Sequence, residues 1–253
     1  MHSFELDNKI AIVTGGAGGI GVVVCQRLAQ AGATVVIADL NEKVALETVD
    51  LISQQGGKAA FIKLDVTNRA NVQSVFNEVA DRYGRVDINV NCAGVTKRMD
   101  TADFEEAAFR WILDVNVVGV FLCAQAAAQH MIKQGQGGKI LNIASVGGLV
   151  GLKGSLGYAC SKGAVVQMIR TMALDLAEYG INVNGVAPAL NRTAIAAPVI
   201  NNPATYQSFM DKIPLKRLCE PMDVACAIQF LCSSASDFIT GQILPVDGGW
   251  TVE

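Results

Sequence analysis

Short apolar runs alternate along the chain with longer segments in which apolar residues recur at helical spacing. The runs are rich in β-branched residues and bounded by glycine or polar positions, which is typical of buried strands. We expect strands at 9–14, 34–38, 59–64, 86–91, 138–143, 181–187 and 241–246. We expect helices at 20–31, 42–55, 69–83, 104–134, 155–179 and 221–233. Apolar strands separated by helices indicate a parallel sheet covered on both faces.

This alternation predicts an α/β fold with a single domain over residues 1–253. The expected architecture is a doubly wound parallel sheet with right-handed crossovers and helices on both faces. Ligands of such sheets bind at the carboxyl ends of the strands. The irregular segment 189–214, in which polar residues are mixed with small apolar ones, is expected to be a substrate-binding loop or lid.

The composition argues against several classes of protein. Hydrophobic residues make up 51% of the chain, charged residues 17%, and the net charge is -3. The 20 Lys and Arg residues are dispersed, so we expect no nucleic-acid partner. Segment 1–10 is too charged for a signal peptide, and no uninterrupted apolar stretch of membrane-spanning length occurs, so we expect no membrane partner. The seven cysteines lack the paired spacings of a zinc site, which predicts no metal and a reduced, cytoplasmic protein, with an imported matrix location left open.

A glycine-rich turn, Thr14-Gly-Gly-Ala-Gly-Gly-Ile-Gly21, lies between the first expected strand and the first expected helix. Glycines let the backbone approach a pyrophosphate closely, and the free N–H groups at the start of the helix face the anion. We therefore expect a dinucleotide to contact five residues of this turn: Gly15, Gly18, Gly19, Ile20 and Gly21.

Asp39 follows at the end of the second expected strand. A carboxylate there accepts hydrogen bonds from the hydroxyls of an adenosine ribose and repels a 2′-phosphate. No Lys or Arg lies at 15–21 or 40–42 to neutralise such a phosphate, and Lys43 is the nearest cation. The expected cofactor is therefore NAD rather than NADP, with Leu40 beside Asp39 in the adenosine site.

Tyr158 and Lys162 are four residues apart on an expected helix and therefore share one face. A free phenol titrates near pKa ~10, and a close cation lowers that value, so Tyr158 is a candidate general base. Ser145, upstream, is a candidate second hydrogen-bonding group. The same spacing occurs by chance in surface pairs, so its meaning depends on the other motifs.

Taken in order, these motifs resemble those of the short-chain dehydrogenase/reductase family, and the resemblance covers residues 8–250. The family's glycine motif corresponds to Thr14, Gly15, Gly19 and Gly21, and its Asn-Asn-Ala-Gly motif to Asn91-Cys92-Ala93-Gly94. Its catalytic asparagine, serine, tyrosine and lysine correspond to Asn116, Ser145, Tyr158 and Lys162. The ending Asp247-Gly-Gly-Trp250 also matches. The resemblance implies a Rossmann fold whose seven parallel strands follow the order 3-2-1-4-5-6-7.

The resemblance implies a role for each catalytic residue. Tyr158 would exchange the proton of an alcohol, and Ser145 would hydrogen-bond the substrate oxygen. Lys162 would lower the pKa of Tyr158 and hold the nicotinamide ribose, while Asn116 would interrupt its helix and anchor a water. Further cofactor contacts are expected at Asp65, Val66, Asn91, Ala93, Gly94, Tyr158, Lys162, Pro188 and Thr193. Substrate contacts are expected at Lys97, Arg98, Ser145, Gly147 and Tyr158.

Relatives in this family are usually homotetramers, so the resemblance implies one here. The interface would use helix 155–179, where apolar residues such as Val165, Val166 and Ile169 exceed one narrow face, together with the last strand. That arrangement would bring residues 250–253 close to a neighbour's pocket.

Four positions bear on, or depart from, the family pattern. Gly18 stands where Arg commonly accompanies NADP, in agreement with Asp39. Cys92 replaces an asparagine, and we expect a packing change there rather than a reactive thiol, because a buried cysteine behaves as a small hydrophobe. Ala189 replaces a glycine, so the loop over the nicotinamide is expected to differ locally, since alanine adopts positive φ less readily. Asn191 stands where an apolar residue is more usual, which leaves the carboxamide contacts open.

The expected activity is the NAD(H)-dependent interconversion of a secondary alcohol and a ketone. Lys97 and Arg98 favour a sugar acid if they reach the pocket, and are otherwise a solvated basic pair. The segment 147–152 suggests a small, partly apolar floor, which favours a polyol, sugar or other small alcohol over a steroid. Two alternatives stay open. One is a 3-oxoacyl-carrier-protein reductase, whose members normally use NADPH, and the other is a catalytically silent NAD(H)-binding regulator.

Overall fold

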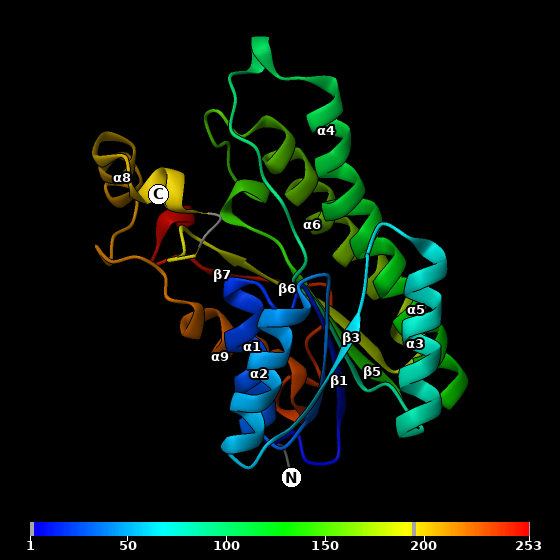
Figure 1. Cartoon of the computed structure of the whole chain (residues 1–253). Helices are drawn as coiled ribbons and strands as arrows, with labels where there is room; N and C mark the ends of the chain where they lie inside the picture. The colour runs from blue at the N-terminus through cyan, green and yellow to red at the C-terminus, as the bar shows by residue number, and fades with distance from the viewer. Residues whose placement is uncertain (1–2, 194–195, 253) are drawn as a thin grey trace.

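A computed structural model describes residues 3–193 and 196–252. Within them, seven strands form one parallel sheet in the order β3-β2-β1-β4-β5-β6-β7 (Figure 1), which confirms the sequence prediction. The strands are β1 (Ile10–Thr14), β2 (Thr34–Asp39), β3 (Lys58–Lys63), β4 (Ile88–Asn91), β5 (Gly138–Ile143), β6 (Ile181–Pro188) and β7 (Ile243–Val246). Residues 194 and 195 of the expected lid, and Glu253, lie outside the described residues.

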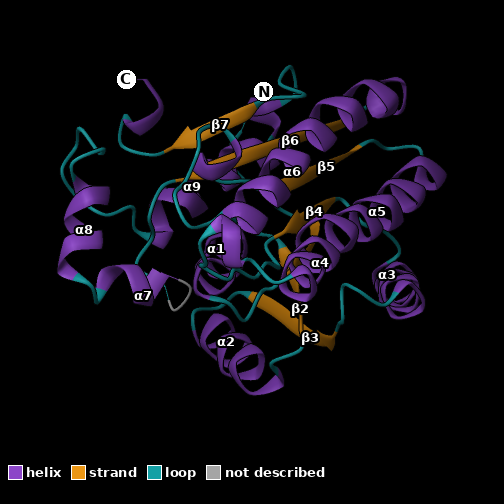
Figure 2. Cartoon of the chain, turned by 90° about the horizontal axis from the view of Figure 1, so that it is seen from above, coloured by secondary structure: helices purple, strands orange, loops and turns teal. Residues whose placement is uncertain are grey.

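Helices cover both faces of the sheet (Figure 1). One face carries α1 (Gly19–Gln30), α2 (Glu42–Gln54) and α9 (Pro221–Cys232). The other carries α3 (Arg69–Tyr83), α5 (Val120–Gln134) and α6 (Leu156–Leu176), with α4 (Glu106–Leu113) against α6. Two short helices, α7 (Ala197–Ile200) and α8 (Pro203–Met210), lie to one side of these layers (Figure 2).

The central strands β1 and β2 are almost entirely apolar because each of their faces packs against a helical layer. Successive side chains of a strand point to opposite faces. In β1, Ile10 and Ile12 therefore join the core under α3, α5 and α6, whereas Ala11 and Val13 join the core under α1 and α9. This two-sided burial is the physical reason for the continuous apolar runs in the sequence.

The expected helix 104–134 begins at Glu106, and a π-helical turn at Asp114–Gly119 interrupts its α-helical hydrogen bonding without ending the helical run. The continuous helical run Glu106–Gln134 is, by length and composition alone, apolar enough to cross a membrane. Its inner face is instead part of the core, where Ala124, Ala127 and Met131 are fully buried. The run is therefore accounted for as a core helix.

Three expectations need correction. The segment 189–214 is not irregular throughout, since it contains α7 and α8. The last strand begins at Ile243 rather than at 241, because Gly241 adopts a left-handed φ of 73°. Val165, Val166 and Ile169 of α6 do not form an exposed apolar surface, because they are buried against the sheet.

The glycine turn packs tightly at the carboxyl edge of the sheet. Gly15 has a φ of 64°, and its backbone N–H donates to Ala38 O of β2 at 2.9 Å. A Cβ atom on Gly15 would lie 2.5 Å from Ala93 N, in the segment that follows β4. A Cβ atom on Gly21 would overlap Gly15 O. The sequence needs glycine at these two positions so that α1 can start directly against the ends of the strands.

We predict that Gly21→Ala lowers the free energy of unfolding by about 1–3 kcal/mol, because the added methyl group overpacks the turn. Gly151→Ala is the matched control, since no atom lies within 4 Å of its Cβ position, and it should change stability by less than about 0.5 kcal/mol. Urea denaturation measures both values. Equal denaturation midpoints for the two variants would contradict the packing argument.

Candidate active site

Three of the four expected catalytic side chains line one cavity at the carboxyl edge of the sheet. Ser145 follows β5, and Tyr158 and Lys162 lie in the first two turns of α6. The cavity measures ≈ 930 Å³, including its mouth. Asn116 lies in the π-helical turn and does not line it.

Ser145 is held in place by its own loop and contacts the phenol. Its side chain accepts a hydrogen bond from Gly147 N at 3.1 Å, and it hydrogen-bonds to Tyr158. Gly147, expected to contact substrate, instead orients Ser145 and does not line the cavity. Burial raises the pKa of Tyr158 above its ordinary value, and the bond to Ser145 only partly opposes this effect. The phenol is therefore protonated at neutral pH in the ligand-free chain.

Lys162 is buried, with 4% of its surface exposed. Its Nζ donates to Ile143 O at 2.6 Å and lies 5.7 Å from the centroid of the Tyr158 ring. Burial lowers the pKa of Lys162 to about 8. The expected lowering of the Tyr158 pKa by this cation does not hold for the ligand-free chain, because burial of the phenol dominates.

Asn116 joins the loop after β4 to α6. Its Nδ2 donates to Val95 O at 2.9 Å and to Ser161 Oγ at 3.0 Å, and its Oδ1 accepts from Val95 N at 2.8 Å. Ser161 Oγ in turn donates to Tyr158 O at 2.7 Å. The expected interruption of the helix at Asn116 is confirmed, and the expected water stays a prediction. Sequence reasoning missed Ser161, whose signal was a polar residue inside an apolar helix next to Lys162.

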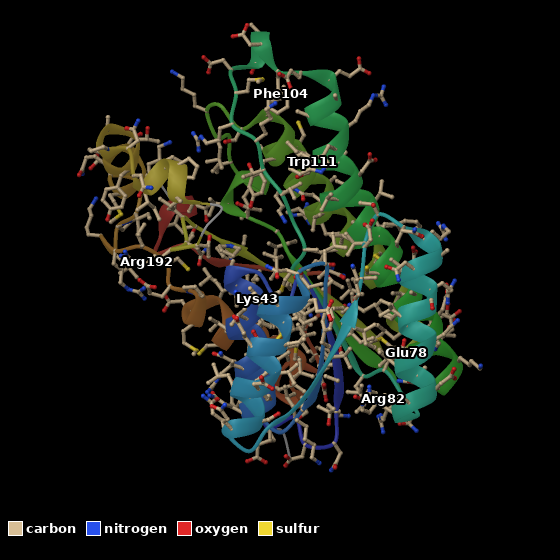
Figure 3. All side chains as sticks on the ribbon, in the orientation of Figure 1. Lys43, Glu78, Arg82, Phe104, Trp111 and Arg192 are labelled. Atoms are coloured by element: carbon tan, nitrogen blue, oxygen red, sulfur yellow. The ribbon has the colours of Figure 1, made fainter. Side chains whose placement is uncertain are left out.

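A second cavity, of ≈ 1300 Å³, runs along the glycine turn and the ends of β2 and β3. It is lined by most of the residues expected to bind the cofactor: Gly15, Gly18, Gly19, Ile20, Gly21, Asp39, Leu40, Asp65, Val66, Ala93, Gly94 and Thr193. Pro188 lines the catalytic cavity instead. Asn91 lines neither, because its Nδ2 donates to Asn142 Oδ1 at 2.9 Å and ties β4 to β5 beneath the site. The half-exposed Trp111 of α4 adds an aromatic wall that sequence reasoning missed (Figure 3).

Two carboxylates mark the outer end of this second cavity. Asp39 Oδ2 accepts from Ala17 N and its Oδ1 from Asn41 N, each at 2.9 Å. Asp65 Oδ1 accepts from Thr67 N at 2.9 Å and from Thr67 Oγ1 at 2.7 Å. No Lys or Arg occurs among the described residues that line this cavity. Lys43 is exposed on α2 (Figure 3).

The two cavities meet at four residues that line both: Ile20, Cys92, Gly94 and Thr193. The residues present fit a dinucleotide. The glycine cradle has no room for a Cβ atom at Gly15 or Gly21, the N-terminus of α1 supplies unpaired N–H groups, and Asp39 offers a carboxylate at the end of β2. A dinucleotide lying along the second cavity would therefore place one end beside Tyr158 and Lys162.

The basic pair expected at the substrate site is split. Arg98 lines the catalytic cavity, where its guanidinium donates to Lys153 O at 3.0 Å and lies 5.5 Å from the ring centroid of Phe209 in α8. Lys97 does not line it, because its Nζ pairs with Glu105 at 2.6 Å. Apolar side chains, among them Leu152 and Val199, form much of the remaining wall.

The departures from the family pattern have visible consequences. Cys92 lies at the junction of the two cavities, and burial raises its pKa to about 12, so its thiol stays protonated. Position 189 does not require glycine, because the φ of Ala189 is not positive. The non-glycine residues with positive φ in the described chain are Asn8 and Lys216. Asn191 is buried and lines the catalytic cavity.

Among residues 3–193 and 196–252, no cluster of three or more His, Cys, Asp or Glu could hold a metal ion.

Comparison with known proteins agrees with this geometry. Residues 15–251 match a family model described as Enoyl-(Acyl carrier protein) reductase. Cyclopentanol dehydrogenase of Comamonas testosteroni is 36% identical over 247 residues, covering 98% of each chain. The 3-oxoacyl-[acyl-carrier-protein] reductase of Thermotoga maritima is 35% identical over 248 residues, covering 98% of this chain and 100% of the relative.

A solved structure is similarly close. A gluconate 5-dehydrogenase from Burkholderia cenocepacia, in complex with NADP and tartrate, superposes with a TM-score of 0.95 at 38% identity, covering 99% of this chain and 98% of the other. Together with the sheet order and the arrangement of Ser145, Tyr158 and Lys162, these matches identify the chain: it belongs to the short-chain dehydrogenase/reductase family of oxidoreductases.

Proposed function

We propose that the chain is an NAD(H)-dependent dehydrogenase that interconverts a small secondary alcohol and its ketone. One observation carries this proposal. Ser145, Tyr158 and Lys162 line a cavity that opens into a dinucleotide-sized cavity at Ile20, Cys92, Gly94 and Thr193. When bound, NAD(H) accepts or supplies a hydride at the nicotinamide ring.

The side chains supply the accompanying proton. In reduction, the protonated phenol of Tyr158 donates its proton to the ketone oxygen, and Ser145 hydrogen-bonds the charge that develops there. In oxidation, Tyr158 must first lose its own proton to solvent, and the phenolate then takes the proton of the alcohol hydroxyl. The ammonium of Lys162, under the ring of Tyr158, favours the phenolate once it forms.

The choice of NAD over NADP rests on Asp39. Its carboxylate stands at the end of β2, and the lining of the dinucleotide cavity includes Asp65 but no Lys or Arg among the described residues. A 2′-phosphate there would meet negative charge without a cationic partner. The Burkholderia relative, solved with NADP, means that the family resemblance alone does not favour NAD.

The cavity wall supports a small substrate. Leu152, Val199 and Phe209 suit the hydrocarbon part of a cyclic or short-chain alcohol, and Arg98 suits a hydroxyl or carboxylate at the mouth. A cyclopentanol dehydrogenase and a gluconate 5-dehydrogenase among the relatives agree with this range. We favour a small cyclic alcohol, polyol or sugar acid as the substrate. We also favour the segment 189–214 as a lid, whose Phe209 ring contacts the guanidinium of Arg98.

A second candidate is a 3-oxoacyl-carrier-protein reductase. The Thermotoga relative favours it, whereas Asp39 disfavours it because such reductases normally use NADPH. A silent NAD(H)-binding regulator is disfavoured by the joint presence of Ser145, Tyr158 and Lys162 in one cavity. A homotetramer stays a prediction, for which Phe121 of α5 and Leu174 of α6 offer exposed apolar side chains.

Incubation with NAD and a panel of cyclic secondary alcohols, polyols and aldonates should produce NADH, measured by its absorbance.

With the best substrate, Tyr158→Phe should reduce kcat/KM by at least about 100-fold, because the proton-transferring group is removed, while the Kd for NADH changes less than about threefold. Tyr179→Phe, at an exposed tyrosine beyond α6, is the matched control. A Tyr158→Phe variant with wild-type kcat would refute the assignment. NADH binding without any turnover would favour the silent regulator.

Fluorescence titration should give a Kd for NADH at least about tenfold lower than for NADPH, since repulsion from Asp39 is worth roughly 1–4 kcal/mol near a protein surface. Asp39→Ser should bring the two values to within about threefold of each other. Asp50→Ser, which removes the same charge from the exposed side of α2, should leave the ratio unchanged. Equal affinities in the wild-type chain would contradict the role of Asp39.

The buried Lys162 predicts a pH dependence of stability. Its pKa is lowered to about 8 in the folded chain, whereas an unfolded lysine titrates near ~10.4. Between these values the unfolded state binds more protons, so this residue's contribution to stability is least favourable below the folded pKa and improves as pH rises, by ~1 kcal/mol per pH unit. The free energy of unfolding of wild type minus that of Lys162→Met, measured by urea denaturation, should therefore increase above about pH 8. A flat or falling difference would show that the pKa of Lys162 is not lowered.

A further inference from the structure

A third apolar cluster joins the end of the chain to the wall of the catalytic cavity. Its buried members are Val146, Ala189, Ile213 and Trp250, against which Leu152, Phe209 and Met210 pack. The members that also line the catalytic cavity are Val146, Leu152, Ala189 and Phe209. Trp250 is 7% exposed and is not among the described residues that line the cavity. The indole therefore lies behind the cavity wall.

Phe209, in the last turn of α8, is the aromatic side chain that Trp250 contacts at this wall. The two rings meet edge to face, with centroids 5.4 Å apart and an interplanar angle of 83°, which is a favoured geometry for aromatic pairs. The guanidinium carbon of Arg98 lies 5.5 Å from the centroid of the same Phe209 ring. No residue of α8 is itself buried. The position of this short helix therefore depends on the contacts that Phe209 and Met210 make with the cluster.

Trp250 is itself held in place by the turn that precedes it. The carboxylate of Asp247 accepts hydrogen bonds from Thr251 N at 2.9 Å and from Thr251 Oγ1 at 2.6 Å. A Cβ atom on Gly248 would lie 2.8 Å from Ile213 Cγ2, so the turn packs closely against the segment that follows α8. Figure 1 shows this C-terminal segment beside α8. Trp250 thus gives Phe209 a fixed surface to pack against.

The cluster also indicates which part of a substrate it meets. Val146 directly follows Ser145, so the apolar wall begins next to the group that hydrogen-bonds the substrate oxygen. The hydrocarbon that contacts this wall is therefore bonded directly to the reacting carbon. A small ring suits such a site, because all of its carbons lie close to the carbon that bears the hydroxyl.

We propose that Phe209 packs against the hydrocarbon ring of a small cyclic secondary alcohol, and that Trp250 is a positioning residue that limits the size of this ring. Trp250 stops Phe209 from moving away from the cavity, so a larger ring has to displace the whole cluster. One extra methylene group in a closed apolar pocket changes kcat/KM by roughly 10–200-fold. This inference rests on the proposed function, because it requires that the chain oxidise an alcohol with NAD.

The test compares the steady-state oxidation of cyclopentanol and cyclooctanol by NAD. The wild-type chain should have a kcat/KM at least about tenfold higher for cyclopentanol. Trp250→Ala should reduce this preference to within about threefold, chiefly through the two KM values, while kcat for cyclopentanol changes less than about threefold. Trp250→Phe keeps an aromatic ring behind Phe209 and should retain most of the preference. Phe238→Ala, at a fully exposed aromatic residue, is the matched control and should leave it unchanged.

A double-mutant cycle separates positioning from a general loss of structure. Phe209→Ala should weaken the preference as Trp250→Ala does, and the double variant should match Phe209→Ala alone, because Trp250 acts through Phe209. Additive effects of the two changes overturn the proposal. A Trp250→Ala variant that loses kcat with both alcohols but keeps their ratio also overturns it, since its role is then only structural. Trp250→Leu replaces the alanine variant if circular dichroism shows that the latter is unfolded.

The outcome for the wild-type chain separates this inference from the proposed function. Oxidation of another alcohol of the panel, but of neither cyclopentanol nor cyclooctanol, overturns the inference and leaves the proposed function standing. If the wild-type chain oxidises no alcohol of the panel, the proposed function fails and the inference fails with it.

Discussion

The hydrogen bonds of Asn116 hold the active site together. The asparagine is fully buried in a π-helical turn, and it bonds both backbone polar atoms of Val95 and the hydroxyl of Ser161. Val95 follows Gly94, which lies where the two cavities meet, and Ser161 bonds the backbone of Tyr158. One side chain thus sets the distance between the loop that borders the dinucleotide cavity and the helix that carries the proton-transferring phenol. The sheet adds the remaining constraint, because its parallel strands bring Ser145 and the glycine turn to the same edge.

Burial shifts the pKa values of the two titratable catalytic groups, Tyr158 and Lys162, and the burial of Lys162 costs stability. The pKa of Lys162 is lowered to about 8 and that of Tyr158 is raised, both chiefly because the groups are removed from water. A protonated phenol and a partly destabilised ammonium in one cavity are suited to passing a proton in either direction.

The sequence predicted the alternating strands and helices and most of the dinucleotide cavity, because apolar runs and glycine turns are local signals. The strand order is set by long-range pairing and was predicted through the family resemblance. The sequence could not predict the features that long-range packing decides. Lys97 and Arg98 are neighbours with identical charge, yet they face different partners. Lys97 forms an ion pair with Glu105 outside the cavity, whereas Arg98 contacts Phe209 and the backbone oxygen of Lys153 at the cavity wall. The side chain of Asn91 bonds Asn142 on the neighbouring strand, a pairing that the sequence does not reveal, and the expected cofactor contact of Asn91 stays a prediction. The pKa of Tyr158 depends on burial, which no spacing of residues reveals.

The central claim is that Tyr158 and Ser145 act on a secondary alcohol or ketone held beside a nicotinamide. A crystal structure of the chain with NADH and an unreactive analogue of its best substrate tests this claim most directly. The account predicts that the analogue's oxygen lies within hydrogen-bonding distance of Tyr158 Oη and Ser145 Oγ, with the reacting carbon about 3–3.5 Å from the nicotinamide ring. A nicotinamide bound outside the cavity of Tyr158, or an analogue oxygen that contacts neither side chain, would contradict it.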